Sequence, residues 1–185
     1  SVRFVDAVAL VISDDIAEAV ELRRGRHRWR ERLPVTIDLP PVVVGGVLLL
    51  AEASGTLCRM DPATGAIRGG WDVGSAVAGV TTDGQRLLVT TARPPRLLAL
   101  TSTGRVHWSA DLDEIDPEPA VAGRWGYLLG GSGRLCVVDL STGEVRATAD
   151  TGLAPHGPPA ALATGGATPL VLRDATGART TVAAP

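Results

Sequence analysis

Short apolar runs alternate with polar, glycine-containing turns along the whole of this 185-residue sequence. The runs are three or four residues long, and no stretch has the 3.6-residue periodicity of an amphipathic helix. They occupy residues 9–12, 47–50, 57–60, 87–90, 97–100, 127–129, 135–138 and 170–172. Runs this short and this apolar are typical of strands buried on both faces, so the pattern predicts an all-β fold.

The polar turns recur with a nearly constant period. Their closing glycines are Gly25, Gly65, Gly104, Gly143 and Gly177, which lie 40, 39, 39 and 34 residues apart. Glycine adopts a positive φ at little steric cost, and the Asp, Ser and Thr before it hydrogen-bond the turn backbone, so each turn is a hairpin corner. A period of about 40 residues with several short strands in each unit is typical of propeller blades. The sequence therefore predicts a β-propeller built from four-stranded antiparallel blades.

The repeat divides the chain into four to five blades within one propeller region, residues 1–185. The expected blades are 1–38, 39–76, 77–116, 117–154 and a shortened one at 155–185, which has lost a strand between Ala163 and Thr168. Residues 2–5 already fit an opening strand. Because an uncovered sheet face costs about 25 cal/mol per Å² of exposed apolar surface, we expect these blades to be a segment of a larger ring. The alternatives are a small closed ring and pairing with another chain.

Four of the turns carry a longer motif, at residues 20–29, 60–65, 98–108 and 138–143. This motif resembles the PQQ-like (quinoprotein-like) propeller repeat, roughly Leu-x-Ala-Leu-Asp-x-x-Thr-Gly-x-x-x-Trp. The resemblance implies a tryptophan that docks between neighbouring blades, four residues after the glycine, and Trp29 and Trp108 have that spacing. In the second blade Trp71 comes two residues later, hence on the same strand face, and we expect it to replace the missing ring.

The resemblance implies a non-catalytic protein-interaction scaffold, similar to the envelope-assembly propellers. Quinoprotein dehydrogenases carry a vicinal cysteine pair, whereas this sequence has no Cys-Cys and no Asn. We find no catalytic constellation, no cofactor site and no metal-like spacing of histidines. Two alternatives stay open: a ligand-sensing domain of a larger bacterial signalling protein, or the remnant of a quinoprotein dehydrogenase. Polar side chains converging on the central channel would favour ligand sensing.

One strand is unusually basic. Alternation along residues 23–32 places Arg26, Arg28, Arg30 and Arg32 on one strand face and Trp29 with Leu33 on the other. Such a row of arginines is a possible docking site for an acidic protein, phosphate or anionic lipid. The alternative is a solvated edge strand whose charges prevent edge-to-edge pairing.

Cys58 and Cys136 occupy the same place in blades two and four, so we expect two buried free thiols and no disulfide between them. Leu98 fills that place in blade three, and Glu18 fills it in blade one, which requires either that the first blade has an open face or that the register of the repeat differs there. Asp111, Asp113, Glu114, Asp116 and Glu118 form an acidic linker that could bind calcium or a basic partner, or could be a solvated loop.

The overall charge and hydropathy limit the kinds of partner that we expect for this chain. The net charge is −2, all 18 basic residues are arginine, and no apolar stretch is long enough to span a membrane as a helix. We therefore expect no nucleic-acid partner and no transmembrane segment, and either a protein partner or the remaining blades of a larger ring. The expected location is the bacterial cell envelope or the secreted fraction, with a cytoplasmic domain of a larger protein as the alternative.

Overall fold

The computed structural model describes residues 2–5, 8–13, 15–34, 36–114, 118–152, 160–161, 170–173 and 179–182. These residues form five antiparallel sheets that follow one another along the chain. The first sheet contains β1 (Val2–Val5), β2 (Val8–Ser13), β3 (Ile16–Glu21) and β4 (His27–Arg32). The second contains β5 (Val42–Val44), β6 (Val47–Ala51), β7 (Thr56–Met60) and β8 (Ile67–Asp72).

The next two sheets have the same strand order. The third contains β9 (Val77–Thr82), β10 (Leu87–Ala92), β11 (Pro95–Leu100) and β12 (Val106–Asp111), and the fourth contains β13 (Ala120–Ala122), β14 (Trp125–Leu129), β15 (Arg134–Asp139) and β16 (Glu144–Asp150). In the last sheet β17 (Ala160–Ala161), β18 (Leu170–Arg173) and β19 (Arg179–Val182) are paired. The predicted loss of a strand between Ala163 and Thr168 lies outside the described residues.

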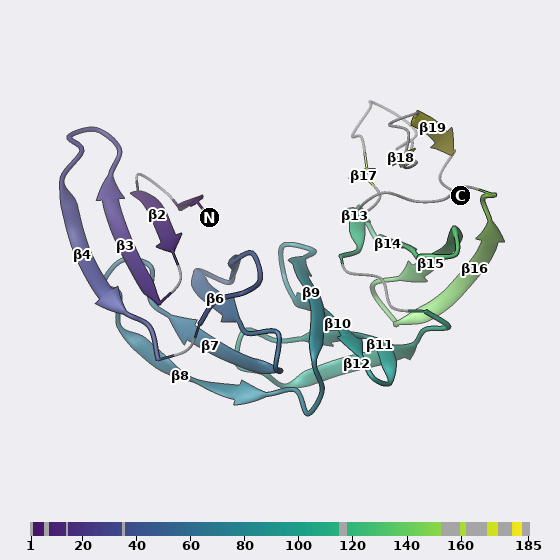
Figure 1. Cartoon of the computed structure of the whole chain (residues 1–185), viewed down its shortest axis with the longest axis horizontal. Coiled ribbons are helices and arrows are strands. Elements are labelled where there is room, and N and C mark those ends of the chain that lie inside the picture. Colours follow the sequence, from purple (N-terminus) through teal and green to yellow (C-terminus); the bar gives the residue numbers. More distant parts are fainter. Residues whose placement is uncertain are drawn as a thin grey trace.

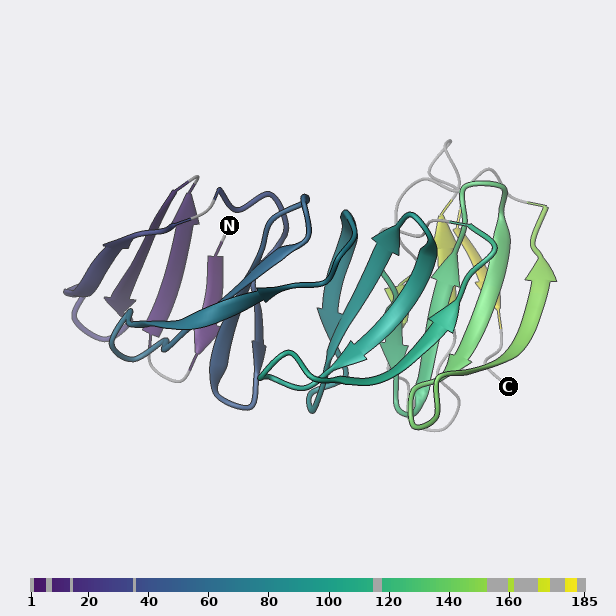
Figure 2. The ribbon, with the colours of Figure 1, turned by 90° about the horizontal axis from the view of Figure 1, so that it is seen from below.

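The sheets are arranged as an open arc (Figure 1). The fourth strands β4, β8 and β16 run along the outside of the arc, and β13 lies on its inner side. Seen from below, the sheets stand next to one another from the first, in purple, to the fourth, in green (Figure 2). This arrangement confirms the prediction of an all-β propeller fold with four-stranded antiparallel blades.

The apolar core lies between consecutive sheets. Leu10 and Ile12 of the first sheet pack in one cluster with Leu48 and Met60 of the second. The second and third sheets, and likewise the third and fourth, enclose similar clusters of leucine and valine. Because the middle strands of each sheet contact a neighbour on both faces, they carry the unbroken apolar runs of the sequence.

Each pairing between the third and fourth strands contains a β-bulge. In the first sheet the register shifts between Ala19, which is opposite Trp29, and Val20, which is opposite His27, so Arg28 is the extra residue. Equivalent shifts occur in the second, third and fourth sheets. A bulge inserts one residue without a partner and reverses the alternation that follows it, so the bulges set which face each outer-strand side chain occupies.

Candidate interaction sites

One contact recurs at three successive sheet interfaces: an indole ring lies against the turn glycine of the following sheet. A Cβ added to Gly65 would lie 2.7 Å from ring atoms of Trp29, and one added to Gly143 would lie 2.6 Å from Trp108. Trp71 covers Gly104 in the same way, and a Cβ added there would clash with the ring. All three glycines have φ between 75° and 87°. Both the left-handed backbone and the ring therefore require glycine at these positions.

Two of these rings are also fixed by a hydrogen bond. Trp29 Nε1 donates to the Pro62 carbonyl at 3.0 Å, and Trp108 Nε1 donates to the Leu140 carbonyl at 2.9 Å. Pro62 and Leu140 have the same place in their turns, three residues before the glycine. Trp71 Nε1 is buried and has no hydrogen-bond partner among the described residues.

The sequence explains why Trp71 differs. In the second sheet Gly69 takes the usual tryptophan position, and Trp71 comes two residues later. Trp71 is opposite Leu57, so it lies farther from the bulge than Trp29 and Trp108 do in their sheets. The receiving turn is also one residue shorter: Gly104 N donates to Thr101 O, three residues back, whereas Gly65 N and Gly143 N donate four residues back. The ring therefore covers the glycine without reaching the carbonyl.

The arginine row of the first sheet departs from the predicted alternation. Arg26 precedes β4, and Arg28 is the extra residue of the bulge. Only Arg30 and Arg32 share a face by register, opposite Glu18 and Ile16. The bulge is the physical reason for this departure, because it inserts one extra residue into the strand. The insertion does not alter the hydrophobic pattern, so the sequence does not reveal it. Trp29 and Leu33 do pack together, in the core between the first two sheets.

All four arginines of this row are exposed. Arg32 Nε donates to Asp15 Oδ2 at 2.7 Å, and its side chain is still 85% exposed. Among the described residues Arg26, Arg28 and Arg30 form no ion pair. The neighbouring His27 Nδ1 lies 3.3 Å from Glu18 Oε2. The row therefore presents three uncompensated guanidinium groups to solvent.

The place shared by Cys58, Leu98 and Cys136 faces the preceding sheet in each case, within the clusters between sheets. Glu18 has the same place on the first sheet, and there its side chain is 24% exposed and pairs with His27. As predicted, the two cysteines form no disulfide with each other; Cys58 is buried as expected, whereas Cys136 is only half-buried. Burial raises the pKa of the Cys58 thiol, against the opposing effect of the Arg59 charge.

The acidic linker ties the third sheet to the fourth. Asp113 lies 3.2 Å from Arg134. Glu114 accepts hydrogen bonds from the backbone N–H of Ser132, at 3.1 Å, and from the Ser132 hydroxyl. These bonds, chiefly that of the hydroxyl, lower the pKa of Glu114. Asp116 lies outside the described residues, and the described ones contain no group of three or more His, Cys, Asp or Glu placed to hold a metal ion.

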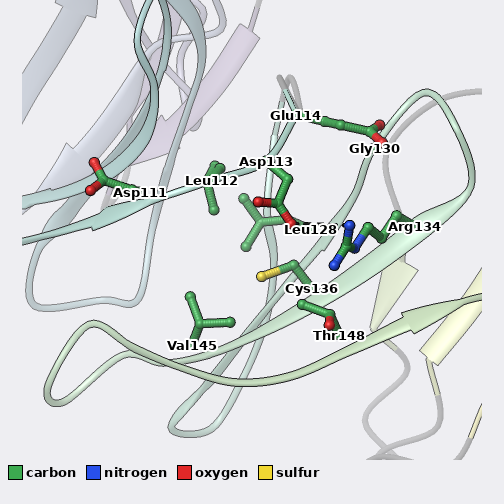
Figure 3. Close-up of a pocket in the computed structure, with 10 residues that line it drawn as sticks. All are labelled: Asp111, Leu112, Asp113, Glu114, Leu128, Gly130, Arg134, Cys136, Val145 and Thr148. Carbon is green, nitrogen blue, oxygen red and sulfur yellow. Dashed lines mark ion pairs between the residues drawn. The ribbon is translucent and has the colours of Figure 1, made fainter.

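A pocket of about 260 Å³ opens beside this linker (Figure 3). Leu112, Leu128 and Val145 give it apolar walls, and the Cys136 sulfur points into it. The ion pair of Asp113 and Arg134 lies at its rim. No histidine is among the described residues that line the pocket. Its chemistry suits the burial of a small apolar group.

A second pocket, also about 260 Å³, lies at the inner strands and is lined by residues of three sheets and the segment before the fourth. Arg3 of β1, Thr81 of β9 and Glu118, which precedes β13, meet there. Burial raises the pKa of Glu118, while the Arg3 charge and a hydrogen bond from Thr81 lower it. Arg3 Nε donates to the Pro41 carbonyl at 2.8 Å. Sequence reasoning missed this group because its members are far apart in the chain and carry no common motif.

Asp139 is the first residue of the fourth Thr-Gly turn, and it hydrogen-bonds the turn backbone as predicted, but sequence reasoning missed its ion pairs with arginine. Its carboxylate accepts hydrogen bonds from the Ser141 hydroxyl at 2.6 Å and backbone N–H at 2.9 Å, and it pairs with Arg124. These partners, the Ser141 hydroxyl first, hold the pKa of Asp139 well below its usual range. Gly25, Gly65, Gly104 and Gly143 all adopt positive φ at their turns, whereas Gly177 lies outside the described residues.

Comparison with known proteins extends these observations. A family model described as outer membrane protein assembly factor BamB matches residues 13–181. No curated protein sequence matches the chain. The described residues contain no helix long and apolar enough to cross a membrane.

Several solved structures share the fold. BamB from Moraxella catarrhalis is 22% identical, with a TM-score of 0.68 over 97% of this chain and 59% of that one. BBS1N in complex with ARL6DN is 14% identical, with a TM-score of 0.75 over 95% of this chain and 60% of that one. The dihydro-heme d1 dehydrogenase NirN is 13% identical, with a TM-score of 0.78 over 94% of this chain and 42% of that one. The chain thus spans 42–60% of the length of these structures.

Proposed function

Because this chain belongs to the family of the outer membrane protein assembly factor BamB, with PQQ-like propeller repeats, we propose that it is a non-catalytic scaffold that binds an acidic protein. Membership of the family supports a protein-interaction role in general. The contact surface in this proposal is the arginine row of the first sheet, Arg26, Arg28, Arg30 and Arg32. Its partner would supply carboxylates, which guanidinium groups bind through two parallel hydrogen bonds.

One observation carries the proposal: three of the four arginines in this row, Arg26, Arg28 and Arg30, have no ion pair among the described residues, whereas arginines on the other outer strands are paired. Arg68 of β8 lies 2.9 Å from Asp61, and Arg146 of β16 lies 3.0 Å from Glu144. An exposed guanidinium without an internal partner gives up no ion pair when it binds a carboxylate. Trp29, which lies within this row, packs against Gly65 and donates to the Pro62 carbonyl, so the strand that carries the row is anchored to the next sheet before a partner arrives.

A binding experiment with a defined acidic probe tests this surface. Fluorescein-labelled decaglutamate is titrated with the protein at 50 and 300 mM salt, and anisotropy is measured. Replacing Arg26, Arg28, Arg30 and Arg32 by serine should weaken binding at least tenfold at low salt. A control with the same change in charge replaces the paired arginines Arg68, Arg96, Arg134 and Arg146. The proposal fails if both variants, shown by circular dichroism to be folded, bind the peptide equally.

A second candidate, ligand sensing, is favoured by the inner pocket alone. Arg3, Thr81 and Glu118 converge there around apolar walls, which is the polar convergence that distinguishes a binding site from a bare scaffold. An arginine and a carboxylate side by side would suit a ligand that carries both charges, such as an amino acid or dipeptide. A thermal-shift screen of such compounds against the protein and its Arg3→Ala variant tests it; no shift with any compound would reject it.

A further inference from the structure

The interface between the third and fourth sheets is more open than the interface between the first and second. Two equivalent residues show this: the leucine four positions after the tryptophan, and the cysteine that faces it from the next sheet. In the first interface these are Leu33 and Cys58, each only 5% exposed. In the third they are Leu112 and Cys136, and both are half-buried. The pocket beside the acidic linker occupies this opening (Figure 3).

The floor of the pocket is a row of side chains across the fourth sheet. Leu128 is opposite Cys136, and Cys136 is opposite Thr148 on the outer strand β16. Val145, also on β16, borders the pocket and is 39% exposed. Leu112 lines it from the segment that follows the third sheet. An opening with so many apolar groups is typical of a surface that another molecule covers.

A further pocket, of about 370 Å³, continues this one along β16. The two pockets share Glu114, Arg134 and Thr148 as lining residues. The further pocket adds Ser132 and Asp150, the last residue of β16. We call the two together the β16 groove. It is apolar at one end and polar at the other, so its shape suits an extended ligand.

The walls of the β16 groove carry more carboxylates than cations. Two of the four carboxylates are balanced by arginine, through the pairs Asp111–Arg96 and Asp113–Arg134. The other two, Glu114 and Asp150, form no ion pair among the described residues and accept hydrogen bonds from N–H and O–H groups instead. The groove therefore has a surplus of negative charge next to an apolar pocket, which favours a ligand that is both apolar and cationic.

We propose that the β16 groove binds an extended basic segment of a partner protein. One apolar side chain of this segment enters the pocket over Cys136, and a lysine or arginine beside it pairs with Glu114 and Asp150. An apolar anchor in a pocket with polar groups around it is the usual arrangement of an interface hot spot. The site goes beyond the proposed function, because the arginine row lies on the first sheet and attracts the opposite charge.

A set of matched peptides tests the chemistry of the ligand. The probe is a fluorescein-labelled peptide with one leucine between two pairs of lysines, and its anisotropy is measured as protein is added at 50 mM salt. It should bind at least tenfold more tightly than a peptide with serine in place of leucine, and than one with glutamates in place of the lysines. Equal binding of the leucine and serine peptides would overturn the proposal.

Filling the pocket tests the location. Thr148→Leu adds apolar volume inside the pocket without a change in charge, so it should weaken binding of the leucine peptide at least tenfold. Ala147→Leu is the matched control, because Ala147 is opposite Val137, which packs in the cluster on the other face of the sheet. This control should bind within twofold of the unmodified protein. Equal binding by the two variants, both shown by circular dichroism to be folded, would contradict the assignment.

The thiol of Cys136 reports occupancy in the unmodified protein. Both cysteines are labelled with dithiodipyridine, and mass spectrometry of the digested protein resolves Cys136 from Cys58. Saturating leucine peptide should slow the labelling of Cys136 at least fivefold and leave that of Cys58 unchanged, since Cys58 lies between the first two sheets. Labelling of Cys136 at the same rate with and without peptide would refute the proposal, whatever the variants do.

Light scattering separates a partner protein from a second copy of this chain. The unmodified protein should be a monomer at micromolar concentration. A dimer that Thr148→Leu dissociates would mean that a second copy occupies the groove, and the proposal would be wrong. Thr148→Leu should leave the binding of decaglutamate unchanged, so failure of this proposal and failure of the proposed function give different results.

Discussion

Replacing Gly143 by alanine would test whether the indole contacts hold the sheets together. Two effects combine at this position. The left-handed backbone costs an L-residue about 1–2 kcal/mol, offset by about 0.4–1 kcal/mol because alanine has fewer unfolded conformations than glycine. The added Cβ would also lie 2.6 Å from Cε3 of Trp108, so the ring must move by about 0.8 Å to regain an ordinary 3.4 Å contact.

The displaced ring adds the larger share of the expected loss. Its hydrogen bond to the Leu140 carbonyl, 2.9 Å long, is worth about 1 kcal/mol. Part of the packing energy is lost with it, within the limit of about 3–5 kcal/mol for complete truncation of a buried aromatic residue. We therefore expect Gly143→Ala to reduce the free energy of unfolding by about 3 kcal/mol, against about 1 kcal/mol for Gly74→Ala, where nothing lies within 4 Å.

Urea denaturation followed by far-ultraviolet circular dichroism measures both values without relying on tryptophan emission. A double-mutant cycle with Trp108→Ala separates the ring from the backbone. Without the indole, Gly143→Ala should cost only the backbone strain, about 1 kcal/mol, so the two changes should not be additive. Additive effects, or a Gly143→Ala variant as stable as Gly74→Ala, would refute the assignment of the contact as a stabilising one.

Three further outcomes are expected. Trp108→Phe should destabilise the protein by about 1 kcal/mol more than Trp71→Phe in urea, because only Trp108 loses a hydrogen bond and Trp71 sheds a buried, unpaired N–H. Cys136, half-buried at a pocket, should react with a chromogenic disulfide at least tenfold faster than Cys58, which is buried and has a raised pKa. The pKa of Asp139 is lowered on folding, so its carboxylate stabilises the protein above about pH 4, and that contribution is lost on acidification. In a plot of the urea midpoint against pH, Asp139→Asn should therefore flatten the acid side.

The sequence was sufficient for those features that follow from period and alternation. The spacing of the turn glycines predicted a repeat of four-stranded sheets, because each of the first four sheets has its glycine turn between the third and fourth strands. In the second sheet Gly69 stands where the repeat has a tryptophan, and alternation along the strand predicted that Trp71 would lie on the same face and replace it. In the structure Trp71 does lie against Gly104. Both inferences rest on local geometry, which neighbouring sheets do not alter.

Features that depend on an irregular residue or on distant segments could not be predicted. The bulge at Arg28 has no hydrophobic signature, so simple alternation assigned four arginines to one face where the register gives two. Arg3 and Glu118 meet because the sheets curve around a common inner side. No motif in either segment indicates this proximity. The polar partners of Asp139 are Arg124, which directly precedes β14, Arg146 of β16 and Ser141 of its own turn, and their meeting depends on strand pairing.

The first sheet departs from the repeat at the positions that face outward from the arc. The last residue of the outer strand is Asp72, Asp111 or Asp150 in sheets two to four, but Arg32 in the first. Glu18 takes a place that is cysteine or leucine in the others. Both changes introduce or reverse a charge on a face that otherwise keeps the apolar rows and the turn glycine needed for sheet packing. The first sheet therefore keeps the packing geometry of the repeat, while the charges on this face differ from those of sheets two to four.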